Sequence, residues 1–585
     1  MRRVNKMASA FRNLALASVF LGASLASATG PVLAPGRAPS KLSAELASVA
    51  KGKMVNVIVQ YRTLTAHEFA QAQTVAKGVM PVKSLSLINA VAMTVKSDSL
   101  ATLANNPNVA HVSIDHQVVE FSTTTDFYDQ AVNAPYAWSA GLDGSGIGVA
   151  VIDSGITDQG DFSGVNGSRV VYSENDNFDG VNNAFGHGSH VAGILGGDGA
   201  NSTGASFTKT FKGIAPNVNL LSFRVLDGAG VGTDSTVIAG IESAINLKNT
   251  YNIRVMNISL GRPVAESYTV DPLCQAVEAA WNAGIVVVVA AGNDGRDNSM
   301  KTNGYGTISA PGNDPYVITV GAMKPEGTAT RADDLIASYS SKGPTLVDHI
   351  VKPDLVAPGN LTISTLASTS AAIYTLFPQD QVAESYYITG GSGSSPYYFT
   401  LSGTSMATPV VSGAAALLLQ HNSSLTPDQV KARLMKTAYK TFPKVSTAVD
   451  PVTGIKYTDY YDMFTVGAGY LDIQAALTNT DTASSTIGSA RSPAVSVDSK
   501  GNVYIVTNSS VVWGTSVVWG TSVVWGTSVV SMSGAESVLT GSSVVWGTST
   551  DGGYSVVWGT SVPAATLATL AAQVDAATAE YFGEK

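Results

Sequence analysis

The amino-acid sequence predicts an α/β fold in which helices cover both faces of a mostly parallel sheet. Apolar runs rich in β-branched residues recur through the middle of the chain, and helix-like stretches separate several of them. Runs that are apolar throughout, rather than alternating, are typical of parallel strands buried on both faces. The predicted strands are 148–152, 169–172, 219–226, 254–258, 285–290 and 317–320.

Three of the predicted helices belong to the same region. Two of them, 234–248 and 272–283, lie between predicted strands. The third, 404–420, is apolar on nearly all sides and is therefore expected to be buried. Pro409 is expected within about its first turn, where proline is tolerated.

Length and composition limit the class of protein. A chain of 585 residues is too long for one ordinary core and predicts two to four domains. The net charge of −9 is spread thinly and provides no basic surface for nucleic acid. Cys274 is the only cysteine, so no intrachain disulfide can form.

The N-terminus reads as a secretory signal peptide over residues 1–28, followed by a linker at 29–50. A basic head precedes an apolar run at 14–25, and the small residues Ala26-Ser27-Ala28 follow it. The apolar run is too short for a stable membrane span, and no other segment reads as transmembrane. The alternative interpretation is an amphipathic leader. A signal peptide implies secretion.

A small α/β pattern follows at 51–123. Thr65 and Glu68 form a capping box at the start of its first helix. The pattern is interpreted as the order β-α-β-β-α-β, which also occurs in ferredoxin-like domains of other purpose, although the elements recognised in the sequence run β-α-β-α-β-β. The predicted strands are 54–61, 90–95, 109–114 and 117–121, and the predicted helices are 65–77 and 97–105.

Three glycine-rich turns, far apart in the sequence, each contain one reactive residue. Asp153 follows an apolar strand, His187 lies between two glycines, and Ser405 opens the buried helix. Sites in parallel sheets are built where the strands end. A carboxylate that orients an imidazole, an imidazole that removes a proton and a hydroxyl that attacks a carbonyl carbon form a nucleophilic triad. Taken singly, Asp153 is equally consistent with a turn residue. The alternative for Ser405 is a helix cap, but Ser402 or Thr404 could fill that role instead.

Two further polar residues belong to these segments. Asn293 follows a strand and has an amide able to donate to an oxyanion, although Asn-Asp-Gly is also a turn signal. His190 is expected to be a buried structural histidine. The competing interpretation, a zinc pair with His187, lacks an evident third ligand.

Taken together, the chain resembles the subtilisin-like serine proteases (subtilases, peptidase family S8). The resemblance rests on the turns around Asp153, His187 and Ser405, in that order, and on three more segments. It implies a serine endopeptidase that is made as an autoprocessed proenzyme, with the peptidase domain at 124–480. Ser189 stands where the family more often has threonine, and 360–400 is longer than in minimal members. The three further segments are Asn257-Ile258-Ser259-Leu260-Gly261, Val288-Val289-Ala290-Ala291-Gly292-Asn293 and Lys352-Pro353-Asp354-Leu355-Val356-Ala357-Pro358-Gly359.

The resemblance also implies roles for other residues. Residues 51–123 resemble the inhibitory prodomain of subtilases, with self-cleavage expected near 120–126. No organic cofactor is implied, and calcium is plausible as a structural ion, although the loop at 196–212, with Asp198 and Asn201, has no recognisable calcium signature. Polypeptide substrates would pair as an added strand, with an apolar preference. The substrate-binding residues so implied are Ser259, Leu260 and Gly261 on one wall and Ala291 and Gly292 on the other, with Asn293 as the oxyanion donor.

The C-terminal region, 481–585, contains repeats of Ser-Val-Val-Trp-Gly-Thr. An even period would place every tryptophan on one side of an extended strand. Three interpretations stay open: contact with sugars or other flat surfaces, a β-ladder for surface attachment or self-association, and a low-complexity spacer. The tryptophans are Trp513, Trp519, Trp525, Trp546 and Trp558.

Two rival functions remain at this point. A catalytically silent binding or adhesion protein would retain the fold as a scaffold. A serine hydrolase acting on esters would use the same chemistry with a different pocket.

Overall fold

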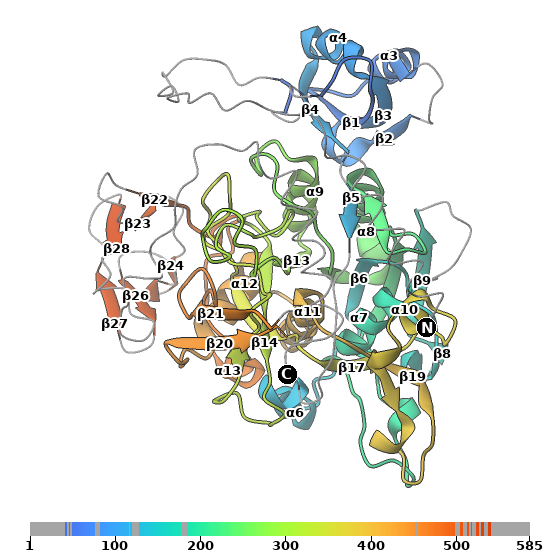
Figure 1. Cartoon of the computed structure of the whole chain (residues 1–585), viewed down its shortest axis with the longest axis vertical. Helices are drawn as coiled ribbons and strands as arrows, with labels where there is room; N and C mark the ends of the chain where they lie inside the picture. Colours follow the sequence, from blue (N-terminus) through green and yellow to red (C-terminus); the bar gives the residue numbers. More distant parts are fainter. Residues whose placement is uncertain are drawn as a thin grey trace. The chain divides into compact units, whose positions relative to one another are not determined.

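The computed structural model describes part of the chain, shown in colour in Figure 1. The chain divides into two compact units, and every described residue belongs to the larger one, 40–559 with 563–585. The predicted signal peptide at 1–28, most of the predicted linker and the expected cleavage segment at 120–126 lie outside the described residues. The described residues are 41–43, 46, 49–76, 82–115, 117–119, 128–165, 167–176, 185–450, 454–497, 503–506, 512–513, 516–517, 522–525, 528–531 and 536–539.

The core of the larger unit is a sheet of eight strands in the order β15-β14-β13-β12-β6-β10-β9, with β16 also paired to β14. All neighbouring pairs are parallel except β14–β15. The mostly parallel α/β fold predicted from the apolar runs is therefore confirmed. The strands are β6 (Gly148–Asp153), β9 (Val170–Asn175), β10 (Asn219–Arg224), β12 (Ile253–Ile258), β13 (Val286–Ala290), β14 (Ile318–Lys324), β15 (Leu335–Ile336) and β16 (Leu355–Pro358).

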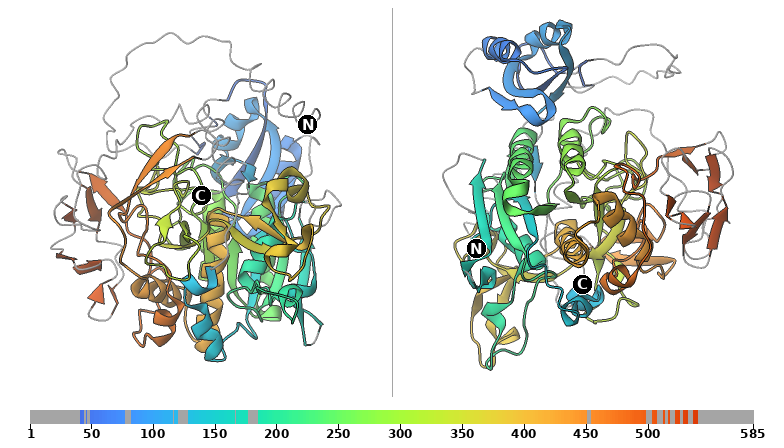
Figure 2. Two further views of the ribbon diagram at one scale, coloured as in Figure 1. Left: turned by 60° about the horizontal axis from the view of Figure 1, so that its bottom comes forward. Right: turned by 180° about the vertical axis from the view of Figure 1, so that it is seen from behind.

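Helices form a layer on each side of this sheet. α7 (His187–Gly196) and α11 (Thr404–His421) pack together on one face, and α8 (Asp234–Tyr251) and α9 (Pro272–Asn282) pack together on the other. Figure 2 shows the same layers from two other directions. The remaining helices of this region are α5 (Tyr128–Ala131), α6 (Ala134–Ser139), α12 (Pro427–Thr437) and α13 (Ile473–Thr478).

Helix α11 is buried along almost its whole length, as its apolar sequence predicted. Pro409, however, lies in the second turn rather than the first, so the expected position was wrong. A proline there cannot donate to the carbonyl four residues earlier, which belongs to Ser405. That carbonyl instead accepts a hydrogen bond of 2.9 Å from the Ser259 hydroxyl, so the lost helical bond is replaced.

The N-terminal elements form a separate four-stranded antiparallel sheet in the order β2-β3-β1-β4. Strand β2 was not predicted, because its three residues are too short for a periodic signal. Thr65 accepts from the Glu68 amide at 3.3 Å, but the Glu68 carboxylate accepts from Asn108 instead of closing the capping box. The elements are β1 (Met54–Tyr61), α3 (Ala66–Ala76), β2 (Lys83–Leu85), β3 (Ala90–Lys96), α4 (Leu100–Asn105) and β4 (Val109–Ile114).

Strand β5 (Gln117–Val119) does not extend this small sheet. It pairs antiparallel with β11 (Val231–Thr233), the short strand immediately before α8. The register joins Val231 to Val119 and Thr233 to Gln117. A strand from the N-terminal part of the chain is thus paired with β11, the short strand before α8.

The long segment at 360–400 forms a three-stranded sheet with its own small apolar core. Strand β19 (Ser394–Leu401) lies between β17 (Thr362–Thr365) and β18 (Gln381–Ala383), and α10 (Ala372–Leu376) precedes β18. The buried side chains of this core are Phe211, Ile363, Val382, Tyr387 and Tyr398.

The region that contains the parallel sheet continues past residue 480. Ala490 donates to Asp428 at 2.7 Å, the Ser492 hydroxyl donates to Asp354 at 2.5 Å, and Val495 donates to the His349 carbonyl at 2.8 Å.

Within the described ranges, every helix is too short or too polar to pass through a lipid bilayer. Two short hairpins complete this region: β7 (Ser163–Gly164) with β8 (Gly167–Ser168), and β20 (Val445–Val449) with β21 (Lys456–Tyr460).

Farther along, only short strands of the repeat region are described. β24 pairs antiparallel with the next strand, β25, so the chain reverses within one repeat. The single extended strand with all tryptophans on one side is therefore not what these residues form. The strands are β22 (Val495–Val497), β23 (Val503–Val506), β24 (Val512–Trp513), β25 (Ser516–Val517), β26 (Ser522–Trp525), β27 (Ser528–Ser531) and β28 (Glu536–Leu539).

Candidate active site

The carboxylate and the imidazole singled out in the sequence are hydrogen-bonded to each other. Asp153 is the last residue of β6, and His187 is the first residue of α7. The His187 Nδ1 atom lies 2.9 Å from Asp153 Oδ1. Both side chains are buried, with exposed fractions of 1% for His187 and 0% for Asp153. A buried carboxylate in this position keeps a proton on Nδ1 and leaves Nε2 to act as a base.

The turns around this pair are held by hydrogen bonds between them. The Ser154 amide donates to Asp153 Oδ1 at 2.7 Å, and the Gly188 amide donates to the Ser154 hydroxyl at 2.9 Å. The Ser189 hydroxyl accepts from the Thr157 amide at 2.8 Å. The hydroxyl that serine shares with threonine is therefore used at residue 189. A Cβ atom on Gly188 would lie 2.4 Å from the Gly155 carbonyl, so this close approach requires glycine.

Ser405 lies at the start of α11 and is bonded to Ser259 in both directions. Its hydroxyl donates to the Ser259 carbonyl at 3.0 Å, and its own carbonyl accepts the Ser259 hydroxyl. The Ser405 side chain is fully buried. Catalytic hydrogen bonds are often formed only when substrate binds. In this structure the Ser405 hydroxyl donates to the Ser259 carbonyl and not to His187.

A chain of buried side chains continues from Ser259. The Asn257 amide donates to the Ser259 hydroxyl at 2.9 Å, and the Ser412 hydroxyl donates to Asn257 Oδ1 at 2.8 Å. This chain joins the end of β12 to α11. The sequence analysis quoted Asn257 as part of a motif but gave it no role, and it did not single out Ser412.

Asn293 is oriented by Thr404, which directly precedes Ser405. The Thr404 amide donates to Asn293 Oδ1 at 3.0 Å, and the Thr404 hydroxyl donates to the same oxygen at 2.9 Å. Because two donors meet at Oδ1, the amide nitrogen of Asn293 is turned away from Thr404. The Ser405 backbone N–H lies in the first turn of α11, where no helical carbonyl accepts it. A side-chain amide and a helix N-terminus are both suited to bind an oxyanion.

The strand ends explain how these residues meet. The register pairs Ile152 of β6 with Ile258 of β12, and Ile258 with Val289 of β13. Because the strands are parallel, the residues that follow them lie at one edge of the sheet. This edge contains Asp153, Ser259 and Asn293. The sequence placed Asp153 and Asn293 after apolar strands, whereas Ser259 was implied by the family resemblance.

His190 is buried and structural in its contacts, as expected. Its Nε2 atom donates to the Thr362 and Phe399 carbonyls, both at 3.1 Å. Burial lowers the pKa of His190 to about 3, and His187 nearby adds to the shift, so the ring is neutral. The described residues contain no cluster of three metal-ligating side chains, so they do not support the zinc interpretation.

The residues predicted to bind substrate are all buried. Ser259, Leu260 and Ala291 have exposed fractions of 0%. Gly292 has a φ of +102°, and a Cβ atom there would lie 2.4 Å from the Ser309 hydroxyl. Glycine at this position is therefore required by backbone conformation and by close packing, as well as by any need for an open pocket.

The substitution Gly292→Ala is expected to lower both stability and peptidase activity. The matched control is Gly390→Ala, because Gly390 also has a positive φ, +76°, but would place its Cβ atom in open space. Both variants incur a backbone cost of about 1–2 kcal/mol, and Gly292→Ala adds an overpacking cost of about 1–3 kcal/mol. Denaturant unfolding measures the difference, and equal losses in the two variants would contradict the packing argument.

The acidic side chains at the loop 196–212, in which the sequence shows no calcium signature, accept hydrogen bonds from nearby groups. Asp161, at the base of this loop, accepts from the Asn201 amide at 2.7 Å and from the Tyr398 hydroxyl at 2.8 Å, so both carboxylate oxygens are used. Asp198 accepts from the Ala200 amide at 2.8 Å. Burial raises the pKa of Asp161 to about 6.

Comparison with known proteins identifies the relatives of this arrangement. Residues 144–454 match the profile of the Subtilase family, peptidase S8. Serine protease AprX of Bacillus subtilis is 40% identical over 306 residues, which is 50% of this chain and 61% of AprX. Subtilisin E of the same organism is 33% identical over 402 residues, which is 68% of this chain and 89% of subtilisin E.

A solved structure has the same fold. Fervidolysin of Fervidobacterium pennivorans, described as a keratinolytic enzyme related to subtilisin, superimposes with a TM-score of 0.54 at 22% identity. The match covers 74% of this chain and 63% of fervidolysin. The chain thus spans less than two thirds of the length of AprX and of fervidolysin.

Proposed function

Because the chain belongs to the subtilase family of serine endopeptidases, we propose that it hydrolyses peptide bonds with Asp153, His187 and Ser405 as its triad. The observation that carries the proposal is the buried bond of 2.9 Å between Asp153 and His187. It is supported by the position of Ser405, at the N-terminus of α11 and next to the residue that orients Asn293.

In the proposed mechanism, the Ser405 hydroxyl leaves the Ser259 carbonyl and donates to His187 Nε2. His187 takes the proton as Ser405 attacks the carbonyl carbon, and Asp153 stabilises the imidazolium. The same proton is then given to the leaving amine, and an acyl-enzyme remains. Water activated by His187 releases the acyl group and restores Ser405.

The negative charge on the tetrahedral oxygen needs donors that are already in place. We assign this role to the Asn293 amide and the Ser405 backbone N–H. Thr404 fixes the Asn293 side chain through two hydrogen bonds, so the donor needs little reorganisation during the reaction. Loss of one such donor costs about 3–4 kcal/mol in the barrier.

Two assays separate this proposal from its rivals. A fluorophosphonate probe labels an active serine, so a silent scaffold protein would not react. Digestion of casein, compared with turnover of a simple ester, then separates a peptidase from an ester hydrolase. Label on Ser405 with casein digestion is the expected result. Ester turnover without casein digestion would contradict the proposed substrate class.

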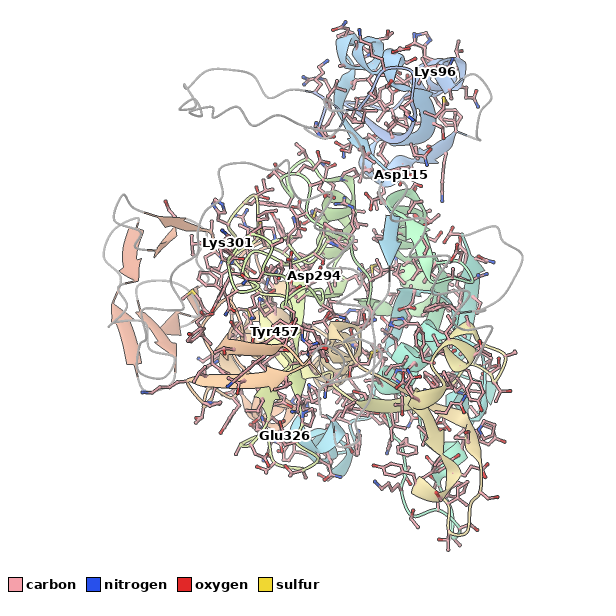
Figure 3. All side chains as sticks on the ribbon, viewed as in Figure 1. Lys96, Asp115, Asp294, Lys301, Glu326 and Tyr457 are labelled. Carbon is pink, nitrogen blue, oxygen red and sulfur yellow. The ribbon has the colours of Figure 1, made fainter. Side chains whose placement is uncertain are left out.

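We further propose that residues 51–123 form an inhibitory prodomain of this enzyme. Three contacts support the proposal, besides the added strand β5 on β11. The Asp115 carboxylate, marked in Figure 3, accepts from the Ser235 amide at 2.9 Å and so caps α8. The Ser113 hydroxyl donates to Glu266 at 2.6 Å, and His111 Nε2 lies 2.8 Å from the same carboxylate.

We expect the purified product of the full-length gene to begin near residues 120–126. The support is that the strand pattern of the prodomain ends there and that β5, just before it, lies on the edge of β11. Edman sequencing of the product measures the new N-terminus, and a start well outside this segment would contradict self-cleavage there.

Secretion is part of the same proposal. It is supported by the basic head and apolar run of the first 28 residues. Recovery of the product from the culture medium, with residues 1–28 removed, is the expected outcome. Recovery only from cells, with these residues retained, would contradict it.

A further inference from the structure

Arg262, the residue directly after Gly261, is a buried cation held by two buried carboxylates. Its Nε atom donates to both carboxylate oxygens of Asp234, at 2.9 and 3.0 Å, and its Nη2 atom donates to Asp271 at 2.8 Å. The exposed fraction is 2% for Arg262 and 0% for both aspartates. Burial alone would lower the pKa of the guanidinium, but the two carboxylates raise it well above its ordinary value.

The two aspartates stand at the N-termini of neighbouring helices. Asp234 is the first residue of α8, and Asp271 caps α9 by accepting from the Leu273 amide at 2.9 Å. Arg262 therefore joins the starts of two helices that pack side by side on one face of the central sheet. Isolated carboxylates in such positions would be expensive to bury, and the guanidinium offsets that cost.

The place of this cluster in the chain suggests what it does. Asp234 directly follows β11, the edge that carries the added strand β5. Arg262 directly follows Ser259–Gly261, the segment that contacts Ser405. One buried ion-pair cluster thus ties the end of β11, which pairs with the added strand β5, to the end of the segment that contacts Ser405. A second tie is backbone: the Arg262 amide donates to the Ala310 carbonyl at 3.0 Å, and the Ala310 amide donates back at 2.8 Å.

We propose that Arg262 is a positioning residue that sets the spacing between β11 and Ser259–Gly261, and so governs the binding of extended peptides. The proposal rests on the peptidase function proposed above. Arg262 touches no reacting atom. It acts through the two segments, so it affects substrates that reach β11 and spares substrates that occupy only the region next to Ser405.

Arginine is suited to this task in a way that lysine is not. A guanidinium presents several N–H donors in a fixed plane and bonds two carboxylates at once, whereas an ammonium group is a point charge on a flexible stem. The variant Arg262→Lys therefore keeps the charge and loses the fixed geometry. Arg169→Lys is the matched control, because Arg169 is also buried but donates to backbone carbonyls, those of Asp161, Ser163, Gly196 and Val218.

The experiment compares two substrates for each full-length, self-processed enzyme. One is an acetylated single-residue ester, and the other is a peptide with at least four residues before the scissile bond. For Arg262→Lys we expect KM for the long peptide to rise about tenfold, with kcat and the ester reaction within about twofold of wild type. Arg169→Lys should change neither KM for the long peptide nor the rate of the ester reaction. Thermal unfolding confirms that each variant is folded.

Each outcome has a definite meaning. An equal fall for ester and peptide in Arg262→Lys would show a merely structural role, and no change in either would also overturn the proposal. If Arg262→Lys does not fold, Asp234→Asn provides the test, because it keeps the shape and one acceptor of the pair. That variant should raise KM for the long peptide about threefold. Failure of the wild-type enzyme to cleave either substrate would instead contradict the proposed function.

Discussion

Replacement of Ser405 by alanine is expected to lower the rate of peptide hydrolysis about a millionfold. The variant loses the only atom that can form the acyl-enzyme, while the rest of the triad stays in place. Alanine also removes the bond from Ser405 to the Ser259 carbonyl, but the reverse bond from the Ser259 hydroxyl to the Ser405 backbone remains. The fold should therefore persist, and rate measurements under single-turnover conditions report chemistry alone.

The same variant tests self-processing. If the chain is cut by its own Ser405, Ser405→Ala should accumulate with residues 51–123 still attached, which mass spectrometry of the purified protein detects. A control is Ser202→Ala, because Ser202 is as buried as Ser405 but bonds Tyr398 and the Phe211 amide. It should cost about 1–2 kcal/mol of stability and still be processed. A processed Ser405→Ala protein would show that another protease makes the cut.

The sheet and the site edge could be predicted because their signals are local. Strands β6 and β13 are buried on both faces, and this burial appears in the sequence as apolar runs, whereas Arg254 and Asn257 interrupt the run of β12. Asp153 ends β6 and Asn293 follows β13, and His187 lies in a glycine-rich turn where a larger neighbouring side chain would collide. At Gly188 the collision is with the Gly155 carbonyl. The site residues and the glycines that their close packing requires therefore occur next to one another in the sequence.

The contacts between distant segments could not be predicted in this way. Asp115 caps α8 from 120 residues away, and Gln60 bonds Gln275 from 215 residues away. Neither pair leaves a periodic or turn signal. The position of Pro409 was misjudged because the donor that replaces its missing N–H lies far away in the sequence. That donor is the Ser259 hydroxyl, which follows β12 and bonds the Ser405 carbonyl. Local patterns do not report such compensation.

Strand β5 shows a related limit. Its three residues read as a last strand of the N-terminal pattern, but they pair with β11, more than 110 residues later. An isolated strand of three residues has no preference of its own for a partner, and the choice is made by the edge that is available. The sequence therefore predicted the strand and not its sheet.

Replacement of Asp153 by asparagine is expected to lower kcat about ten-thousandfold. Asp153 Oδ1 accepts from both the Ser154 amide and His187 Nδ1, at 2.7 and 2.9 Å. An asparagine that keeps its oxygen there preserves both bonds but cannot stabilise the imidazolium with charge. An asparagine that turns its NH2 group toward Nδ1 forces the ring proton onto Nε2, and His187 then cannot accept from Ser405. Both arrangements slow the attack.

Asp161→Asn is the matched control, since Asp161 is also fully buried and lies only eight residues along the chain, but bonds Asn201 and Tyr398 instead of a catalytic group. Its kcat should stay within about tenfold of wild type.

Because burial raises the pKa of Asp161 to about 6, its carboxyl holds a proton above the pH at which an unfolded aspartate releases it. The native state thus binds more protons than the unfolded state between about pH 4 and 6, so this group's destabilising effect grows as pH rises through that window. Asp161→Asn should accordingly make stability less dependent on pH between 4 and 6 while sparing kcat, whereas Asp153→Asn should lower kcat. A loss of kcat below about tenfold in Asp153→Asn would mean that the imidazolium formed on His187 does not need the Asp153 charge.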